Sequence, residues 1–395
     1  MPANRKIVLC VGHAFARNYG DRAIYEVIKE VLASHAGLHT RAFPIKPVYL
    51  NRAGHTFGPL RKLLTGLVLL PPHYWRLFRR ARRSHAVLIG TGNPLMDIHP
   101  LHTVQLLLTC LVIRAAGRRI WVFGGGAGPI DTRLGRFCIG AACRLAESVT
   151  VRDTRSVEIL RQCKGVGPLL RHPAPDVVLS LAPPRPPREP GARLRVGIGA
   201  IHYMRPGRSA GAIRAGAYEE YLDRLERLAR LVVSRLDADV LVFTNEPTED
   251  QTTVDDVVHR LRDLDRVKSA PVHTVAEAMR VAGSCDLHVG GRLHSVIFSL
   301  IQGVPAVALS SHGKIIGLYT DLDATDLLFD IATFEPERVV QCLDALRGPR
   351  GARLLANVER LRRQAAAGLH RLAADVGYFV ARGTHLPAVS WRAGA

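Results

Sequence analysis

The chain has 395 residues, of which 47% are hydrophobic and 22% charged. This composition is typical of folded globular proteins, and the length exceeds what one ordinary core needs, so we expect two domains. No apolar run reaches the roughly 18–20 residues that span a bilayer, and the first residues lack a signal-peptide pattern. The seven cysteines stand singly, without a pairing pattern, which argues against a disulfide framework and favours reduced thiols in the cytoplasm.

The net charge of +20 is concentrated in the first half of the chain. Residues 1–182 carry 26 Lys and Arg against 9 Asp and Glu, whereas residues 183–395 carry 28 against 25. No acidic residue lies between Glu30 and Asp97. Such a one-sided field favours an anionic partner, either an anionic membrane surface or a phosphate-bearing, lipid-linked sugar. The sequence has no nucleic-acid-binding motif, so we expect no nucleic acid; a general use of arginine on solvated surfaces stays an alternative.

The first 182 residues alternate short apolar runs with amphipathic stretches. The runs are apolar almost throughout, as in strands buried on both faces of a parallel sheet. We predict strands at 7–11, 40–43, 86–90, 120–123, 149–151 and 177–181, and helices at 22–34, 101–116, 134–146 and 154–162. The apolar run 63–70 is expected to stop at Pro71 and Pro72. This alternation predicts a basic N-terminal Rossmann-like domain over residues 1–182.

A proline-rich stretch, residues 183–191, is predicted to be a linker. The alternation restarts after it, which predicts a C-terminal Rossmann-like domain over residues 192–382 and a tail at 383–395. Strands are expected at 194–199, 240–244, 287–289 and 306–309, and helices at 218–236, 252–262, 275–282, 295–302 and 354–372. The predicted fold class is therefore α/β with two Rossmann-like domains. Such folds bind ligands at the carboxyl ends of their strands, here in a cleft between the domains.

Polar and glycine-rich loops follow several strands of the first half. The first strand leads into Asn18-Tyr-Gly-Asp21, where Asp21 can cap the next helix or line a polar loop. Glycine-rich loops at 90–97 and 124–129 end two further strands and would allow a ligand to approach the backbone. Arg152 follows the fifth strand, either as part of a capped turn or as a bidentate donor for a carboxylate or phosphate.

The most specific pattern lies in the second half, in Val289-Gly-Gly-Arg-Leu-His-Ser295. Arg292 and His294 are two residues apart at a strand-to-helix turn, so both can point into one pocket beside a helix N-terminus, where backbone amides bind anions. A histidine satisfied within the core is the ordinary alternative. The neighbouring arginine and glycines favour a functional site.

Dinucleotide, ATP and metal chemistry have weak support. The sequence lacks the G-x-G-x-x-G spacing and the Walker A motif. Asp97, His99 and His102 do not follow a known metal-ligand spacing, and a pair such as Asp321 with Asp323 is more often a solvated turn. We expect no metal site.

The order of these motifs resembles the polysaccharide pyruvyl transferase family. The start Asn18-Tyr-Gly-Asp-Arg-Ala-Ile24 resembles the N-x-G-D-x-A-I start of that family. The further matching motifs are the loop ending in Asp97, Gly124-Gly-Gly-Ala-Gly-Pro129, Arg152-Asp-Thr-Arg-Ser156, Arg292-Leu-His294, Gly303-Val-Pro305 and Lys314. The resemblance extends from residue 7 to about residue 330.

The resemblance implies a GT-B-like fold and transfer of pyruvate from phosphoenolpyruvate, as co-substrate without a cofactor, to two hydroxyls of one glycan or glycolipid sugar, forming a cyclic ketal. A doubly anionic donor needs fixed cations, and carbon 3 must gain a proton. We therefore expect His294 as the general acid, with Asp97 or, second, Asp21 accepting a proton from the sugar. The donor-binding residues are expected to be Arg152, Arg292, Lys314, Gly290, Gly291 and Ser295, and the acceptor side is expected to hold Asn18, Asn93 and Gly125.

Two other functions stay open. A nucleotide-sugar glycosyltransferase of the same architecture would need a diphosphate site and a ribose-binding carboxylate, and the sequence indicates only the first. A non-catalytic basic module would bind an anionic membrane or polymer. In each case we expect a cytoplasmic protein, with peripheral contact between its basic N-terminal domain and an anionic membrane.

Overall fold

The computed structural model describes residues 6–12, 18–45, 59–90, 92, 94–97, 100–189, 191–203, 216–310 and 312–383. The chain forms two compact units, the first from residues 1–15, 24–177 and 364–395 and the second from residues 16–23 and 178–363. Helices α1 (Tyr19–Ala36) and α13 (Pro349–Arg382) each contribute to both units. The predicted linker, residues 183–191, lies within the second unit, where its described residues form neither helix nor strand.

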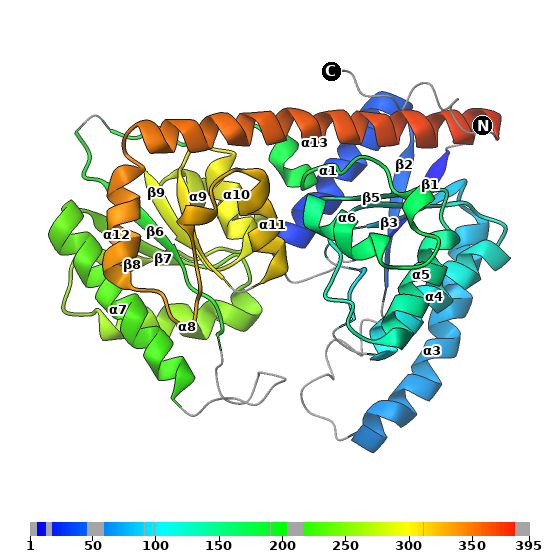
Figure 1. The fold of residues 1–395 in the computed structure, drawn as a ribbon, viewed down its shortest axis with the longest axis horizontal. Coiled ribbons are helices and arrows are strands. Elements are labelled where there is room, and N and C mark those ends of the chain that lie inside the picture. The colour runs from blue at the N-terminus through cyan, green and yellow to red at the C-terminus, as the bar shows by residue number, and fades with distance from the viewer. Residues whose placement is uncertain are drawn as a thin grey trace. The chain divides into compact units, whose positions relative to one another are not determined.

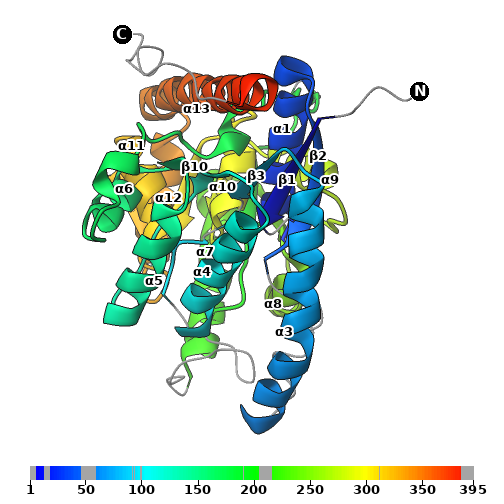
Figure 2. The same cartoon turned by 90° about the vertical axis from the view of Figure 1, so that its right-hand side faces the viewer.

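The first unit is built on a five-stranded parallel sheet in the order β2-β1-β3-β4-β5 (Figure 1). Its remaining elements are β1 (Ile7–Gly12), β2 (His39–Pro44), α3 (Pro59–Arg82), β3 (Ala86–Gly90), α4 (Pro100–Ala115), β4 (Ile120–Gly125), α5 (Arg133–Arg144), β5 (Ser148–Val151) and α6 (Thr154–Arg161). Every residue of β3, β4 and β5 is buried, as their apolar sequences predict. Right-handed crossovers place α3, α4 and α5 on one face of the sheet, with α4 packed between α3 and α5 (Figure 2).

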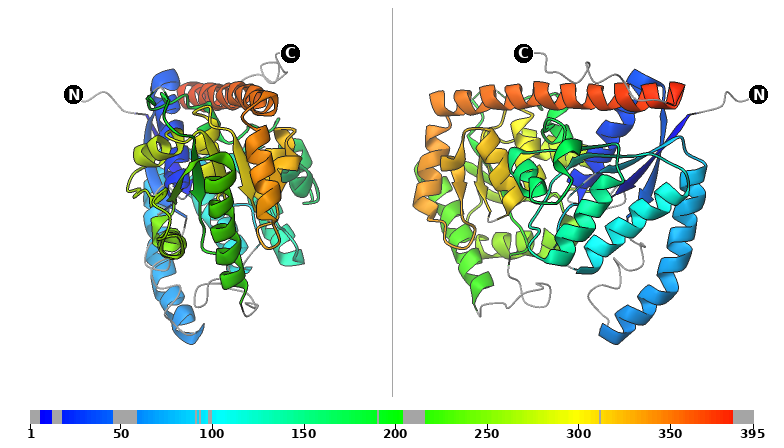
Figure 3. Two further views of the ribbon diagram at one scale, coloured as in Figure 1. Left: turned by 90° about the vertical axis from the view of Figure 1, so that its left-hand side faces the viewer. Right: turned by 45° about the vertical axis from the view of Figure 1, so that its right-hand side comes forward.

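The second unit is built on a six-stranded parallel sheet in the order β11-β10-β9-β6-β7-β8, green to orange in Figure 3. Its elements are β6 (Arg195–Gly199), α7 (Ala217–Leu236), β7 (Asp239–Phe243), α8 (Pro247–Arg260), β8 (Val267–Ser269), α9 (Val275–Gly283), β9 (Leu287–Gly290), α10 (Leu293–Leu300), β10 (Ala306–Leu309), α11 (Gly313–Asp321), β11 (Leu328–Phe329) and α12 (Pro336–Ala345). The predicted α/β class is confirmed. Strands β8 and β11 are too short to give a sequence signal, and α11 and α12 were not predicted.

Two predictions for the first half are wrong. Residues 177–181 were expected to form a strand, but Val177–Ser180 is a short 3₁₀ helix whose three apolar side chains are fully buried. A short apolar run satisfies burial in either conformation, so periodicity does not distinguish them. Helix α3 continues through Pro71 and Pro72 instead of stopping there. Both prolines are exposed, so water can bond the carbonyls that lose a helical partner.

The state of the cysteines and the character of the helices can be compared with what the composition predicts. All seven cysteines are free thiols, and all but Cys342 are buried. Among the helices that the structure describes, none is both long and apolar enough to cross a membrane.

Candidate functional site

The carboxyl edge of the second sheet carries most of the predicted site residues. The strand order reverses where β6 and β9 pair, and open α/β sheets bind ligands at such a reversal. The Gly291 amide donates to the Gly199 carbonyl over 3.1 Å, which joins the two strand ends. A Cβ atom at Gly290 would lie 2.5 Å from Val296, and one at Gly291 would lie 2.7 Å from Ile201. Both glycines are therefore required for the close turn that presents Arg292.

Arg292 is fixed by two carboxylates of α8. Its Nε donates to Asp250 Oδ2 over 2.5 Å, and its Nη2 donates to Asp250 Oδ1 over 2.8 Å and to Glu249 Oε2 over 3.1 Å. Asp250 is fully buried and also accepts hydrogen bonds from the His202 amide and the Thr244 hydroxyl. Burial opposes the charge of Arg292, but the Asp250 bonds outweigh it and raise the pKa of the guanidinium above its ordinary value. The predicted donor-binding arginine is thus held in place and partly neutralised.

His294 lies in the first turn of α10, beneath the start of α1. The side chain is 5% exposed, and a Cβ atom at Gly20 would overlap the imidazole ring. The segment that covers the ring is itself anchored: Asn18 Oδ1 accepts from the Gly20 amide over 2.8 Å, and the Tyr19 amide donates to the Asn245 carbonyl over 3.1 Å. The structure therefore brings Asn18 and His294, predicted from distant parts of the sequence, to one edge.

Glu246 is a functional candidate that the sequence analysis missed. It lies between β7 and α8 and is 5% exposed. Burial raises the pKa of its carboxyl group to about 7; Arg292 opposes the rise, while the negative charges of Glu249, Asp250 and Asp21 add to it. Asp21, in the first turn of α1, therefore faces the same edge. A carboxyl group that exchanges its proton near neutral pH is suited to general acid–base chemistry.

A sequence signal for Glu246 did exist. The segment Thr244-Asn-Glu-Pro247 places a carboxylate directly after a strand, and proline at a first helical position marks the start of the next helix. Carboxylates at the ends of parallel strands share the ligand-binding edge. No such signal exists for the burial of Asp250, which depends on an arginine 42 residues away.

Further positive charge at this edge comes from the first turn of α11, after β10. Desolvation and the charges of Lys314 and Arg292 lower the pKa of His312, so the three groups lie within electrostatic range of one another. Helices α10 and α11 both begin at this edge, and helix N-termini carry partial positive charge. Lys314, predicted to bind the donor, is thus placed where an anion would be attracted.

Ser295 has a packing role in this structure. Its hydroxyl donates to the Arg292 carbonyl over 3.0 Å and lies 3.3 Å from His288 Nε2. His288 is fully buried within the sheet, and burial lowers its pKa to about 3, so the ring is neutral. These contacts favour a role for Ser295 in holding the turn; its contact with a donor stays a prediction.

Arg152 occupies a different setting, in the first unit. Its Nη1 lies 3.5 Å from Asp176 Oδ2 and its Nε 3.6 Å from Asp153 Oδ2, and all three side chains are buried. Asp153 also accepts from the Ser156 amide over 2.7 Å and so caps α6. This geometry favours a structural ion cluster, and the predicted donor contact of Arg152 stays a prediction.

Asp97 supports the start of α5. Its Oδ2 accepts from the Thr132 amide over 2.9 Å and from the Thr132 hydroxyl over 2.5 Å, and Thr132 in turn caps the helix. One carboxylate oxygen of Asp97, the predicted base, is therefore already occupied by hydrogen bonds to Thr132. At Gly125 a Cβ atom would lie 2.9 Å from Pro94 Cδ, so this glycine allows two loops to pack closely.

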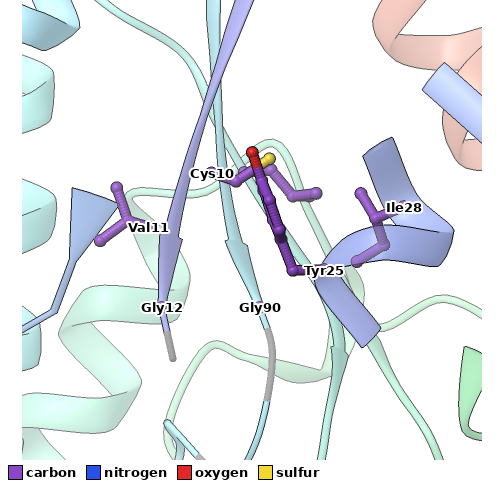
Figure 4. A pocket seen from close by; sticks show the side chains of 7 residues that line it. Cys10, Val11, Gly12, Tyr25, Ile28 and Gly90 are labelled. Carbon is purple, nitrogen blue, oxygen red and sulfur yellow. The ribbon is translucent and has the colours of Figure 1, made fainter. Parts of the chain in front are cut away.

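Asn93 and His99 lie outside the described residues. Within the described part of the chain, no group of three or more His, Cys, Asp or Glu residues could hold a metal ion. A small pocket lies where the strand order of the first sheet reverses, at the ends of β1 and β3, lined by Cys10, Gly12, Tyr25 and Gly90 among others (Figure 4). Burial raises the pKa of the Cys10 thiol to about 12, which makes it a poor nucleophile.

Comparisons with known proteins agree with this description. Residues 18–313 match the family described as polysaccharide pyruvyl transferase, whereas no curated protein sequence matches the chain. Among solved structures, HepE of Anabaena, in complex with UDP and glucose, has a TM-score of 0.54 at 11% identity, covering 95% of this chain and 99% of that one. MnaA of S. aureus with UDP has a TM-score of 0.61 at 11% identity, covering 97% and 99%. A glycosyltransferase from Rickettsia africae has a TM-score of 0.55 at 10% identity, covering 96% and 100%. These similarities show a GT-B-like fold.

Proposed function

Because the chain belongs to the polysaccharide pyruvyl transferase family, we propose that it transfers pyruvate from phosphoenolpyruvate to two hydroxyls of a glycan or lipid-linked sugar. The family match supports a transferase that modifies polysaccharides. The finer proposal rests on one observation: His294, Glu246 and Arg292 gather at the carboxyl edge of one sheet, where the strand order reverses.

The reaction needs one proton donor and one proton acceptor. Carbon 3 of phosphoenolpyruvate gains a proton, which makes carbon 2 electrophilic, and a sugar hydroxyl adds to carbon 2. The carbon–oxygen bond to phosphate then breaks, inorganic phosphate leaves, and the second hydroxyl closes the ketal ring. Each hydroxyl loses a proton. One of these protons restores the general acid that protonated carbon 3, and the other leaves with the phosphate.

We assign the first proton transfer to His294. Glu246 is the base candidate that we favour, because it lies at the same strand-end edge as Arg292 and its carboxyl, with a pKa of about 7, is partly ionised at neutral pH. Asp21, close enough to influence that pKa, and Asp97, with one oxygen bonded to Thr132, are further candidates for the same step.

The anionic groups of the donor would bind at the starts of α10 and α11. Lys314 and the helix N-termini supply positive charge there, and Arg292 borders the same edge. Arg152 is the least supported donor-binding residue, because Asp153 and Asp176 already pair with it. No cofactor is needed for this chemistry.

The test is turnover with phosphoenolpyruvate and a panel of glycans and lipid-linked sugars. We expect inorganic phosphate to be released only when both substrates are present, with a pyruvylated product detected by mass spectrometry. Phosphate release without acceptor, or sugar transfer from a nucleotide sugar, would contradict the proposal.

A nucleotide-sugar glycosyltransferase is the second candidate, because two structurally similar proteins were solved with UDP. The two candidates differ in the ligand that stabilises the fold. A ligand present at 100 times its Kd stabilises the protein by about 2.7 kcal/mol. Phosphoenolpyruvate should therefore raise Tm, whereas UDP-sugars should leave it unchanged.

A further inference from the structure

Three neighbouring helices of the first unit, α3, α4 and α5, are basic without any acidic residue. They carry six, one and three Lys and Arg residues respectively, and no Asp or Glu. Since α4 packs between the other two (Figure 2), their solvent-facing sides form one continuous surface. We call this surface the α3–α5 face.

The middle of the α3–α5 face is apolar. On α4, Leu101, Leu108 and Leu111 are 59%, 39% and 45% exposed, and Val104 and Val112 are half-buried. Leu101, Val104 and Leu108 follow one another at steps of three and four residues, and Leu111 and Val112 lie three and four residues after Leu108, so all five share one side of the helix. The outward stripe of a surface helix is ordinarily charged or polar, but Arg114, half-buried, is the one charged residue of α4.

Both flanking helices add a bulky apolar side chain beside arginines. Trp75 on α3 is 60% exposed and precedes the exposed Arg76 and Arg79. Phe137 on α5 is 63% exposed and follows Arg136. Every exposed large hydrophobic residue in the described part of the chain belongs to this face: Trp75, Leu101, Leu108, Leu111, Leu134 and Phe137.

We propose that the α3–α5 face docks the protein on the surface of an anionic phospholipid bilayer. An apolar centre bordered by arginines complements such a surface: the leucines and aromatic rings enter the headgroup region while the guanidinium groups meet lipid phosphates. The absence of acidic residues on all three helices removes the repulsion that an anionic surface would otherwise exert. This docking does not depend on the reaction proposed for the second unit.

The test is sedimentation of the full chain with phosphatidylglycerol-containing vesicles and with pure phosphatidylcholine vesicles. We expect binding to the anionic vesicles that weakens with salt, and at least 10-fold weaker binding to the neutral ones. The double variant Leu108→Glu/Leu111→Glu should lose binding. The matched variant Ser234→Glu/Ala356→Glu adds the same charge at exposed helix positions of the second unit and should bind like the native chain.

A second variant keeps the proposal falsifiable if the first one misfolds. Arg76→Gln/Arg79→Gln removes two exposed cations of α3, and at about 1 kcal/mol for each it should weaken binding about 30-fold at low salt. Tm measurements show which variants are folded. Equal vesicle binding by folded variants and native chain would overturn the proposal. A dimer that Leu108→Glu/Leu111→Glu dissociates, without vesicle binding by the native chain, would instead identify the face as a protein interface and also overturn it.

Discussion

Arg152 and Arg292 offer a comparison between the two units. Each follows a strand of a parallel sheet, and each is paired with two carboxylates, but the side chain of Arg152 is 4% exposed and that of Arg292 is 23% exposed. Asp153 and Asp176 surround Arg152 in the first unit. Around Arg292 lie further titratable groups and the starts of two helices. The comparison teaches that the surroundings of an arginine at a strand end, more than its position, decide whether it borders a site.

The largest effect is expected from His294→Gln. This change keeps a polar side chain of similar length beneath Gly20 but removes the proton donor, so kcat should fall by about 10²–10⁴-fold. The measurement is phosphate release with phosphoenolpyruvate and an acceptor, with Tm as the control for folding. Turnover equal to that of the native chain would remove His294 from the mechanism.

The pair Arg152→Met and Arg292→Met tests the comparison directly. Arg152→Met leaves two buried carboxylates unpaired and should cost about 3–5 kcal/mol of unfolding free energy, measured by denaturant titration. Arg292→Met should destabilise less, because Glu249 is 54% exposed and the buried Asp250 keeps its hydrogen bonds from the His202 amide and the Thr244 hydroxyl. It should also raise KM for phosphoenolpyruvate. A rise in KM for Arg152→Met at unchanged stability would show instead that both arginines bind the donor.

The smallest effect is the pH dependence of Glu246. Its pKa is about 7 in the folded protein against an ordinary value of 4.5, so from pH 4.5 to pH 7 the unfolded chain binds fewer protons than the folded one. Stability therefore falls as pH rises through this window, by about 3 kcal/mol in total. Glu246→Gln should abolish this loss in thermal unfolding measured across the window. An unchanged pH dependence would show that the carboxyl titrates normally.

The same variant separates a catalytic role from a stabilising one. If Glu246 is the base, the pH profile of kcat should lose its limb near pH 7 in Glu246→Gln. A lower kcat with an unchanged profile would leave Glu246 as a positioning residue.

Sequence patterns predicted the two parallel sheets because their strands are apolar almost throughout, and they located the Arg292–His294 turn because two glycines precede it. They failed where contacts between distant parts of the chain determine burial, pKa or the extent of a helix. The burial of Asp250 depends on Arg292, and the pKa shift of Glu246 depends on desolvation and on charges from three elements. The helix through Pro71 depends on solvent exposure. None of these has a local signature.

The membership of α1 in both units affects how such proteins can be recombined. Its first residues belong with the second unit and its remainder with the first. A chimera joined at the proline-rich stretch would take residues 18–23 from one parent and His294 from the other, so the ring and the Gly20 backbone that covers it would come from different parents. Transplanting the second half together with residues 18–23 keeps His294 and the Gly20 backbone that covers it from the same parent.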